Sequence, residues 1–256
     1  MQTVKSENVG PVTVVTIDRP EARNAVNGPT ALALEKAFWD FDRDDAQRVA
    51  VLTGSGGTFC SGADLKALGT PDENKARREG PGPMGPTRMQ LSKPVIAAVE
   101  GYAVAGGLEL AVWCDLRVAA SDSVFGVFCR RWGVPLIDGG TVRLPRLIGH
   151  SRAMDMILTG RPVEASEAFE IGLANRIVEP GQALEAAIEL ANQLAALPQN
   201  CLRSDRRSAM AQWSRDEHDA MDFEFASGFE VLMSGESQSG ATKFREGSGR
   251  HGSFES

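Results

Sequence analysis

Residues 94–115 constrain the fold more than any other stretch, because a strand-like run there meets a glycine pair and then a helix-like apolar segment. Residues 94–99 are rich in small and β-branched side chains, and Gly106-Gly107 precedes the apolar residues 108–113. A helix N-terminus presents backbone N–H groups without intrahelical acceptors and carries a partial positive charge. Because glycine lets a ligand approach closely, the Gly106 N–H is a candidate cradle for standing or developing negative charge.

Glu109 is the one charged residue among residues 106–113. It follows Gly106 by three positions, and residues at that spacing share one face of a helix. A carboxylate is therefore predicted beside whatever the Gly106 N–H binds. The neighbours Leu108 and Leu110 indicate that Glu109 is buried, and buried carboxylates are rare unless they are paired or used. The alternative is an exposed glutamate on a surface helix behind a glycine turn.

The composition limits the class of protein. The chain has 256 residues, enough for one large core with an appendage, and its net charge of -7 argues against nucleic-acid binding. Without a membrane-length apolar run or a signal-peptide pattern, we expect a cytoplasmic protein that does not bind membranes. The spacing of the histidines and cysteines predicts no metal site and fits reduced thiols. The cysteines are Cys60, Cys114, Cys129 and Cys201.

The hydrophobic pattern alternates strands with helices and predicts an α/β core. Strands are expected at residues 9–17, 49–53, 94–99 and 116–120, and helices at 31–41, 108–113, 151–158, 163–174 and 183–197. Residues 199–244 are mostly helical in pattern and carry an apolar stripe. This tail is predicted to fold back on the core or to pack on another subunit.

Two loops complete the pattern. The small-residue turn Ser61-Gly62-Ala63 leads into Asp64, a candidate helix start, and is a second place where backbone N–H groups are expected to be free. Residues 69–86 are rich in glycine, proline and charge, which is typical of a mobile loop or a broken helix. Such a segment either lines or covers a pocket or is a solvated linker.

Five stretches, in this order, together resemble the enoyl-CoA hydratase/isomerase superfamily, whose fold is called the crotonase fold. They are RPEARNA at 19–25, FCSGADL at 59–65, GYAVAGGLELAVWCD at 101–115, GGTVRLPRLIG at 139–149 and LTGRPVEASEAFEIGLA at 158–174. The resemblance spans nearly the whole chain, and the set is specific to the superfamily rather than to one reaction. It implies an α/β fold, a crotonase-like spiral of ββα repeats over residues 1–198. Residues 199–256 would form a helical trimerisation region, giving a homotrimer or homohexamer.

The resemblance also implies a chemistry. The family binds acyl-CoA thioesters and stabilises an enolate at the thioester oxygen with two backbone N–H groups, which fall here on Ala63 and Gly106. Removing one such donor typically costs about 3 kcal/mol of transition-state stabilisation. The implied substrate is a coenzyme A thioester, and no permanently bound cofactor is expected.

The resemblance accounts for only one of the two acid/base residues of the family hydratases. Family hydratases hold a water with two glutamates, of which Glu109 matches the first. The second falls on Cys129, and a thiol with an ordinary pKa of about 8.5 is a poor stand-in for a carboxylate. Cys129 is otherwise a core thiol. Asp138, the nearest carboxylate downstream, is either catalytic or the N-cap of a helix beginning near Gly139.

Further positions in the matching stretches are candidates for contact with the substrate or with CoA. They are Ala22, Arg23, Ala25, Ser61, Asp64, Leu65, Lys66, Tyr102, Cys129 and Trp132. Arg23 and Lys66 are cations suited to the phosphates of CoA, and the alternative for each is a solvated surface charge.

We therefore expect an acyl-CoA enzyme of the hydratase/isomerase type, a lyase of fatty acid metabolism that hydrates an enoyl-CoA. Because Cys129 replaces the second glutamate, three alternatives remain. They are an enoyl-CoA isomerase, an acyl-CoA hydrolase and a non-catalytic acyl-CoA-binding protein.

Overall fold

The structure is a computed structural model and describes residues 2–249. Its internal contacts divide the chain into a unit that ends at Leu194 and a unit that begins at Ala195. The first unit combines two β-sheets with helices, and the second is helical. The predicted α/β class is confirmed. The division falls in the last turn of the helix that contains both residues, close to the expected boundary at 198/199.

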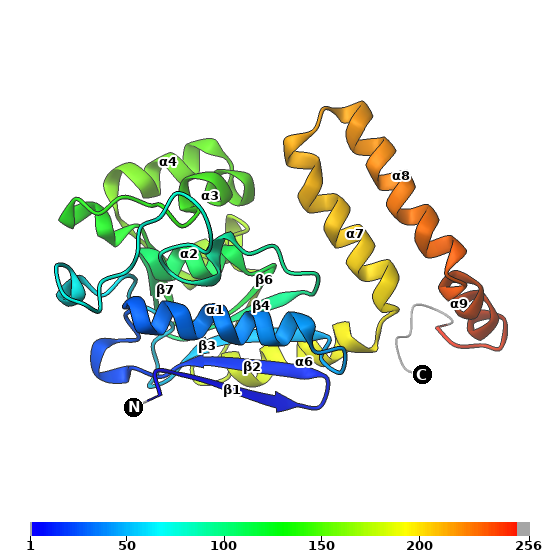
Figure 1. Cartoon of the computed structure of the whole chain (residues 1–256), viewed down its shortest axis with the longest axis horizontal. Helices are drawn as coiled ribbons and strands as arrows, with labels where there is room; N and C mark the ends of the chain where they lie inside the picture. Colours follow the sequence, from blue (N-terminus) through cyan, green and yellow to red (C-terminus); the bar gives the residue numbers. More distant parts are fainter. Residues whose placement is uncertain (1, 250–256) are drawn as a thin grey trace. The chain divides into compact units, whose positions relative to one another are not determined.

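The main sheet of the first unit has six strands, in the order β1-β2-β3-β4-β6-β9. Their bounds are β1 Val4–Val9, β2 Val12–Ile17, β3 Val49–Gly54, β4 Val95–Val99, β6 Leu116–Ala120 and β9 Arg176–Val178. β1 and β2 form an antiparallel hairpin at one edge, and every other pair is parallel (Figure 1). The inner strands are almost wholly buried, as the near-continuous apolar runs of a parallel sheet require.

The strand predicted over residues 9–17 is wrong at its start. Val9 ends β1, and β2 begins only at Val12 because Gly10, at φ 59°, turns the chain between them. β1 was missed because it is an edge strand on which only Val4 is buried, so it shows no hydrophobic periodicity.

A smaller, three-stranded sheet leads into the helix that contains Gly106 and Glu109. It contains β5 Tyr102–Val104, β7 Val124–Gly126 and β8 Pro162–Glu164, in the order β5-β7-β8. The chain leaves the main sheet at β4, turns at Gly101, enters β5 and then begins helix α2, Gly106–Trp113. It repeats that path from β6 through β7 to the short helix η4, Phe128–Trp132. Each ββα step thus adds one strand to the main sheet and one strand to the smaller sheet.

The remaining helices of the first unit largely follow the predicted pattern. They are α1 Gly28–Arg43, α3 Gly140–Ile148, α4 His150–Thr159, α5 Ala165–Glu170 and α6 Ala183–Ala196, with the short helices η1 Pro20–Ala22, η2 Leu65–Ala67 and η3 Pro86–Arg88. The helix predicted over 163–174 is shorter, because residues 162–164 pair with β7. Figure 1 shows α1 beside β2, where it buries Leu34, Phe38 and Phe41.

The second unit contains α7 Gln199–Ala211, η5 Gln212–Ser214, α8 Glu217–Met233 and α9 Glu236–Arg245. Small buried residues, Ser204, Ser208 and Ser227, let α7 and α8 approach each other. An apolar stripe on α8 remains exposed, and its members are Met221, Phe225, Phe229 and Leu232. Residues 250–256 of the predicted helical region lie outside the described residues.

Arg117 is a buried cation that fixes the end of α2. Its guanidinium donates to the carbonyl oxygens of Leu173 (2.6 Å) and Cys114 (2.8 Å) and to Asn175 Oδ1 (3.2 Å). A positive charge at a helix C-terminus opposes the partial negative charge there. One side chain therefore provides hydrogen-bond donors both to the end of α2 and to the segment before β9.

We predict that Arg117→Met lowers the free energy of unfolding by about 3 kcal/mol, because it leaves buried carbonyl groups without donors. Urea unfolding measures the change, with the exposed Arg78→Met as the matched control. Equal stability of the two variants would contradict this role for Arg117.

Candidate active site

The turn at Ala63 is strapped to the segment before α1. The Val26 N–H donates to the Gly62 carbonyl (2.8 Å), and the Asp64 N–H donates to the Val26 carbonyl (2.9 Å), which pairs Val26 with Ala63. Backbone groups alternate in direction along such a pairing, so the Ala63 N–H points away from Val26. Within residues 2–249 it has no acceptor.

Gly106 begins α2, and its N–H likewise has no acceptor in the described part of the chain. The preceding residue, Ala105, adopts φ 54° and ψ −125°, a conformation that is costly for a residue with a side chain. A Cβ added to Gly62 would lie 3.0 Å from the Gly106 nitrogen, so the Ala63 and Gly106 turns adjoin. Two backbone donors without acceptors among the described residues thus lie on neighbouring turns.

Close packing makes both glycines of the pair necessary. A Cβ at Gly106 would lie 2.7 Å from the Met84 sulfur, and one at Gly107 would lie 2.0 Å from the Cys60 carbonyl oxygen. Any side chain at these positions would push α2 away from the Cys60–Ala63 segment or displace Met84. The glycine pair therefore sets how closely the two turns approach.

Glu109 is buried, with 3% of its surface exposed, which excludes the surface-helix alternative. Its Oε1 accepts hydrogen bonds from the backbone N–H groups of Asp138 and Gly140, both at 2.8 Å. Its Oε2 has no partner among the described residues. One oxygen is thus anchored, and the other is available to a ligand.

Burial raises the pKa of Glu109 to about 7. The negative charge of Asp138 acts in the same direction, whereas the N–H groups of Gly140 and Asp138 and the charge of Arg143 oppose the rise. Near neutral pH the carboxyl group is therefore present in both forms. A group of this kind can both accept and donate a proton.

Asp138 is not a helix cap, so that interpretation is wrong. The cap of α3 is Gly139, at φ 97°, and no side chain caps this helix at its cap position. Asp138 Oδ1 instead accepts from the Met84 N–H (2.9 Å) and from the Thr87 hydroxyl. The first N–H of α3, that of Gly140, is taken by Glu109. Burial raises the pKa of Asp138.

The segment Gly82–Thr87 is anchored to the site rather than solvated. Met84 and Thr87 of this segment donate hydrogen bonds to Asp138. In addition, Arg143 donates to the carbonyl oxygens of Thr87 (2.7 Å) and Asp138 (3.0 Å). Met84 is fully buried against Gly106. Sequence reasoning missed Met84 and Thr87, although the small and apolar residues at 82–86 interrupt an otherwise polar loop and signal burial.

Cys129 lies in η4 and is buried. Burial raises the pKa of its thiol, and the charge of Glu109 raises it further. Cys129 is therefore a neutral thiol near Glu109 at neutral pH. It does not replace a second carboxylate as a base.

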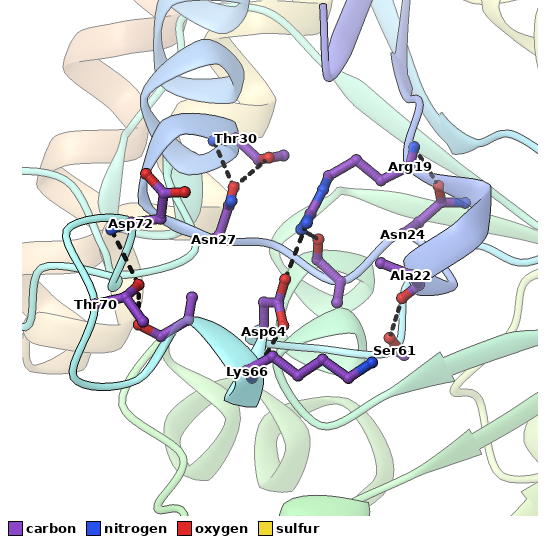
Figure 2. Close-up of polar contacts among 12 residues, drawn as sticks. Arg19, Ala22, Asn24, Asn27, Thr30, Ser61, Asp64, Lys66, Thr70 and Asp72 are labelled. Carbon is purple, nitrogen blue, oxygen red and sulfur yellow. Dashed lines mark hydrogen bonds and ion pairs between the residues drawn. The ribbon is translucent and has the colours of Figure 1, made fainter. Parts of the chain in front are cut away.

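The other candidates fall into two groups. The structure brings residues 22–25 together with 61–66, where the Ser61 N–H donates to the Arg23 carbonyl (3.1 Å) and the Ser61 hydroxyl to the Ala22 carbonyl (3.4 Å) (Figure 2). Ala25 is buried, whereas Arg23, Leu65 and Lys66 are exposed. By contrast, Tyr102 and Trp132 expose their side chains, and within residues 2–249 neither side chain forms a hydrogen bond or ring contact with another candidate.

Asp64 uses both carboxylate oxygens within the protein. Oδ1 accepts from the Lys66 N–H (3.1 Å) and so caps η2, and Oδ2 pairs with the Arg19 guanidinium at 3.0 Å. The predicted helix start at Asp64 is confirmed, although the helix is a single short turn. Residues 2–249 contain no cluster of three or more His, Cys, Asp or Glu side chains suited to a metal ion.

Comparison with known proteins gives a consistent result. The model of the family described as "Enoyl-CoA hydratase/isomerase" matches residues 7–254. The enoyl-CoA hydratase EchA19 of Mycobacterium tuberculosis is 36% identical over 259 residues, covering 96% of this chain and 97% of that protein. The short-chain-enoyl-CoA hydratase of Clostridium acetobutylicum is 33% identical over 249 residues, covering 96% and 95%. The carnitinyl-CoA dehydratase of Salmonella typhi is 41% identical over 187 residues, covering 72% and 71%.

Solved structures agree with these relatives. An enoyl-CoA hydratase from Mycobacterium tuberculosis superposes with a TM-score of 0.91 at 38% identity, covering 95% of this chain and 96% of that one. The enoyl-CoA hydratase EchA1 from Mycobacterium marinum gives a TM-score of 0.90 at 37% identity, with the same coverage. The crotonase-like fold inferred from the motifs is confirmed.

The raised pKa of Glu109 predicts a pH-dependent stability. Between pH 4.5 and about 7 the folded chain retains a proton that the unfolded chain has released, so the free energy of unfolding falls as pH rises through this window. Glu109→Gln removes this effect. We expect the free energy of unfolding of the variant to exceed that of the wild type by about 3 kcal/mol at pH 8 and to equal it near pH 4. Urea unfolding at several pH values measures the difference, and parallel profiles would contradict the assignment.

Proposed function

Because the chain belongs to the enoyl-CoA hydratase/isomerase family and is an acyl-CoA enzyme of the hydratase type, we propose that Glu109 drives the addition of water to a trans-2-enoyl-CoA. The supporting observation is its buried carboxyl group. Oε1 is held by two backbone N–H groups, Oε2 is without a partner in the described chain, and burial raises the pKa to about 7. Such a group is poised to exchange protons at neutral pH.

The N–H groups of Ala63 and Gly106 form the oxyanion hole in this proposal. Both lack acceptors within residues 2–249 and lie on adjoining turns. Donors fixed in advance stabilise charge that develops on the thioester oxygen without having to reorganise. The N-terminal end of α2 adds its partial positive charge at the same place.

In the proposed reaction one carboxyl group, that of Glu109, both removes a proton from water and returns a proton to the substrate. Glu109 accepts a proton as the water oxygen bonds to the β-carbon, and the electron pair of the double bond moves to give an enolate at the thioester oxygen. Glu109 then returns a proton to the α-carbon, and the enolate collapses to the 3-hydroxyacyl-CoA. Asp138 is the proposed second carboxyl group, orienting the water through Oδ2, which has no partner among the described residues. Cys129 then only lines the site.

Hydration is favoured over the alternatives by two observations. The relatives named above are hydratases and a dehydratase, all of which catalyse the addition or removal of water. A carboxyl group with a pKa near 7 favours catalysis over simple acyl-CoA binding. Isomerisation of a 3-enoyl-CoA and thioester hydrolysis are the competing outcomes in the test below.

The turn formed by residues 22–25 and 61–66 is the proposed binding surface for CoA. Arg23 and Lys66 are exposed on it and would face the phosphates, while the small side chains of Ala22, Ala25 and Ser61 let the chain of CoA pass. The acyl-CoA is the proposed substrate, and the reaction requires no bound cofactor. No helix within residues 2–249 is long and apolar enough to cross a membrane. A cytoplasmic role in fatty acid metabolism completes the proposal.

The apolar stripe on α8 supports a homotrimer, or a homohexamer of paired trimers. Phe225 and Phe229 stack with ring centroids 5.9 Å apart, yet 72% and 49% of their surfaces are exposed. Exposed aromatic stripes of this kind favour burial against another protein surface. The proposed partner is a second copy of the chain.

We predict that Glu109→Gln lowers kcat for a short trans-2-enoyl-CoA by about 100-fold or more and leaves acyl-CoA binding nearly intact. Wild-type activity should rise with pH through about 7, as Glu109 loses its proton. Mass spectrometry detects the gain of one water, and loss of the conjugated-thioester absorbance gives the rate. Glu170→Gln, an exposed carboxyl group on α5, is the control.

Asp138→Asn is measured in parallel and should lower kcat by about 10-fold or more. Unchanged turnover in Glu109→Gln would reject the proposed role of that residue. If the wild type leaves 2-enoyl-CoA unchanged but shifts the double bond of a 3-enoyl-CoA or releases free CoA, the isomerase or hydrolase alternative replaces hydration.

Phe225→Asp and Phe229→Asp should reduce the oligomer to a species of 27.4 kDa, because each places a charge in the proposed interface. Light scattering after size exclusion measures the mass, and Glu224→Gln on the same helix is the control. A wild-type protein that is monomeric at micromolar concentration would contradict the assembly.

A further inference from the structure

Arg19 joins the two sides of the strap that holds Ala63. One guanidinium nitrogen pairs with Asp64 Oδ2 at 3.0 Å, and the other donates to the Ala25 carbonyl at 2.5 Å. Figure 2 shows the Arg19 and Asp64 side chains directed toward each other. Ala25 and Asp64 flank Val26 and Ala63, the pair joined by the β-bridge. The planar guanidinium thus bridges both strands of the strap, through groups that lie one residue from Ala63 and Val26.

This ion pair is more shielded than an ordinary surface pair. The side chains of Arg19 and Asp64 are only 15% and 13% exposed. Exposed pairs contribute little because water screens them, whereas shielding strengthens both the attraction and its directional hydrogen bonds. The pair is therefore able to fix the geometry of the turn.

The chain segment that supports Arg19 is also rigid. Asn24 is fully buried, accepts from the Arg19 N–H (2.9 Å) and donates to the carbonyl oxygens of Ser55 (2.8 Å) and Thr58 (2.6 Å). Arg23 and Asn24 have φ angles of 51° and 55°, which are uncommon for residues with side chains. Backbone strain persists where surrounding contacts enforce it, and it concentrates at functional positions.

We propose that Arg19 is a positioning residue for catalysis, acting through Asp64 on the Ala63 N–H. On this view the Asp64 carboxylate serves the oxyanion hole rather than contacting CoA. The inference rests on the proposed function, since it matters only if the Ala63 N–H receives charge from a thioester oxygen. It adds to that function two side chains that never touch the substrate.

The physical expectation is a selective loss of transition-state stabilisation. A donor that moves by a fraction of an ångström loses most when charge develops on its acceptor, and least toward a neutral ground-state carbonyl. Loosening the Ala63 turn should therefore reduce kcat and affect substrate binding little. A merely structural role for Arg19 would lower stability without this split.

The test compares Arg19→Met, Asp64→Asn and the double variant with the wild type. Asp64→Asn keeps an oxygen able to cap η2, so it remains informative if Arg19→Met does not fold. We expect each single variant to lower kcat by roughly 10- to 100-fold with KM changed by no more than about twofold. The double variant should be little worse than either single one, because all three break the same link. Arg19→Lys should recover part of kcat.

Acetoacetyl-CoA provides a readout independent of turnover. It is acidic enough to bind as an enolate, whose ultraviolet absorbance reports stabilisation of negative charge on its oxygens. The wild type should bind the enolate, and Arg19→Met should bind the same compound mainly in its neutral form. Lys36→Met, which breaks the exposed Lys36–Asp40 pair, is the matched control and should behave as the wild type.

The outcomes separate the two proposals. A wild type that hydrates enoyl-CoA, with Arg19 variants that keep kcat and the enolate signal, would overturn the inference alone. A rise in KM that accounts for the whole loss would do the same. A wild type that neither turns over enoyl-CoA nor binds the enolate would overturn both. If the wild type binds the enolate without turnover, the proposed hydration is wrong. The enolate signal of the Arg19 variants then decides whether Arg19 positions the Ala63 N–H.

Discussion

The structure of the site depends on the two backbone hydrogen bonds that Glu109 Oε1 accepts from Asp138 and Gly140. A carboxylate this far from water would otherwise be strongly destabilised, and these donors compensate part of that penalty. The same bonds satisfy the first N–H of α3 and hold the carboxyl group of Asp138 in place to latch Met84 and Thr87. Glu109 thus also connects α2 to the start of α3.

The position of α2 is fixed at both of its ends. Arg117 binds the carbonyl oxygens at its C-terminus, and at its N-terminus Gly107 packs on the Cys60 carbonyl. Because neither end is free to shift, the N–H of Gly106 keeps its place beside the Ala63 turn. Rigid support of this kind is what allows backbone donors to stabilise charge without reorganising.

The sequence alone was sufficient for features that are local. Glu109 sits between leucines three residues after Gly106, so its burial and its place beside the helix start follow from helical spacing. The adjacency of Ala63 and Gly106 is not local, and only the resemblance to a family placed them together. The hydrogen bond that the Met84 N–H donates to Asp138 could not be predicted for the same reason, since aspartate serves equally well as a helix cap and as an anchor for a distant loop. The Asp138 error shows that the acceptor preference of aspartate does not identify its donor.

The charge state of Glu109 links the stability of the protein to its proposed chemistry. A fully solvated glutamate has a pKa too low to return a proton efficiently at neutral pH, and burial is the largest influence that raises the pKa of Glu109 to about 7. Burial with fewer donors would raise the pKa of Glu109 further and favour the protonated form, which cannot activate water. The two N–H groups oppose that rise. In the proposed mechanism, the backbone donors around Oε1 therefore help to keep the carboxyl group able to act as a general base and as a general acid.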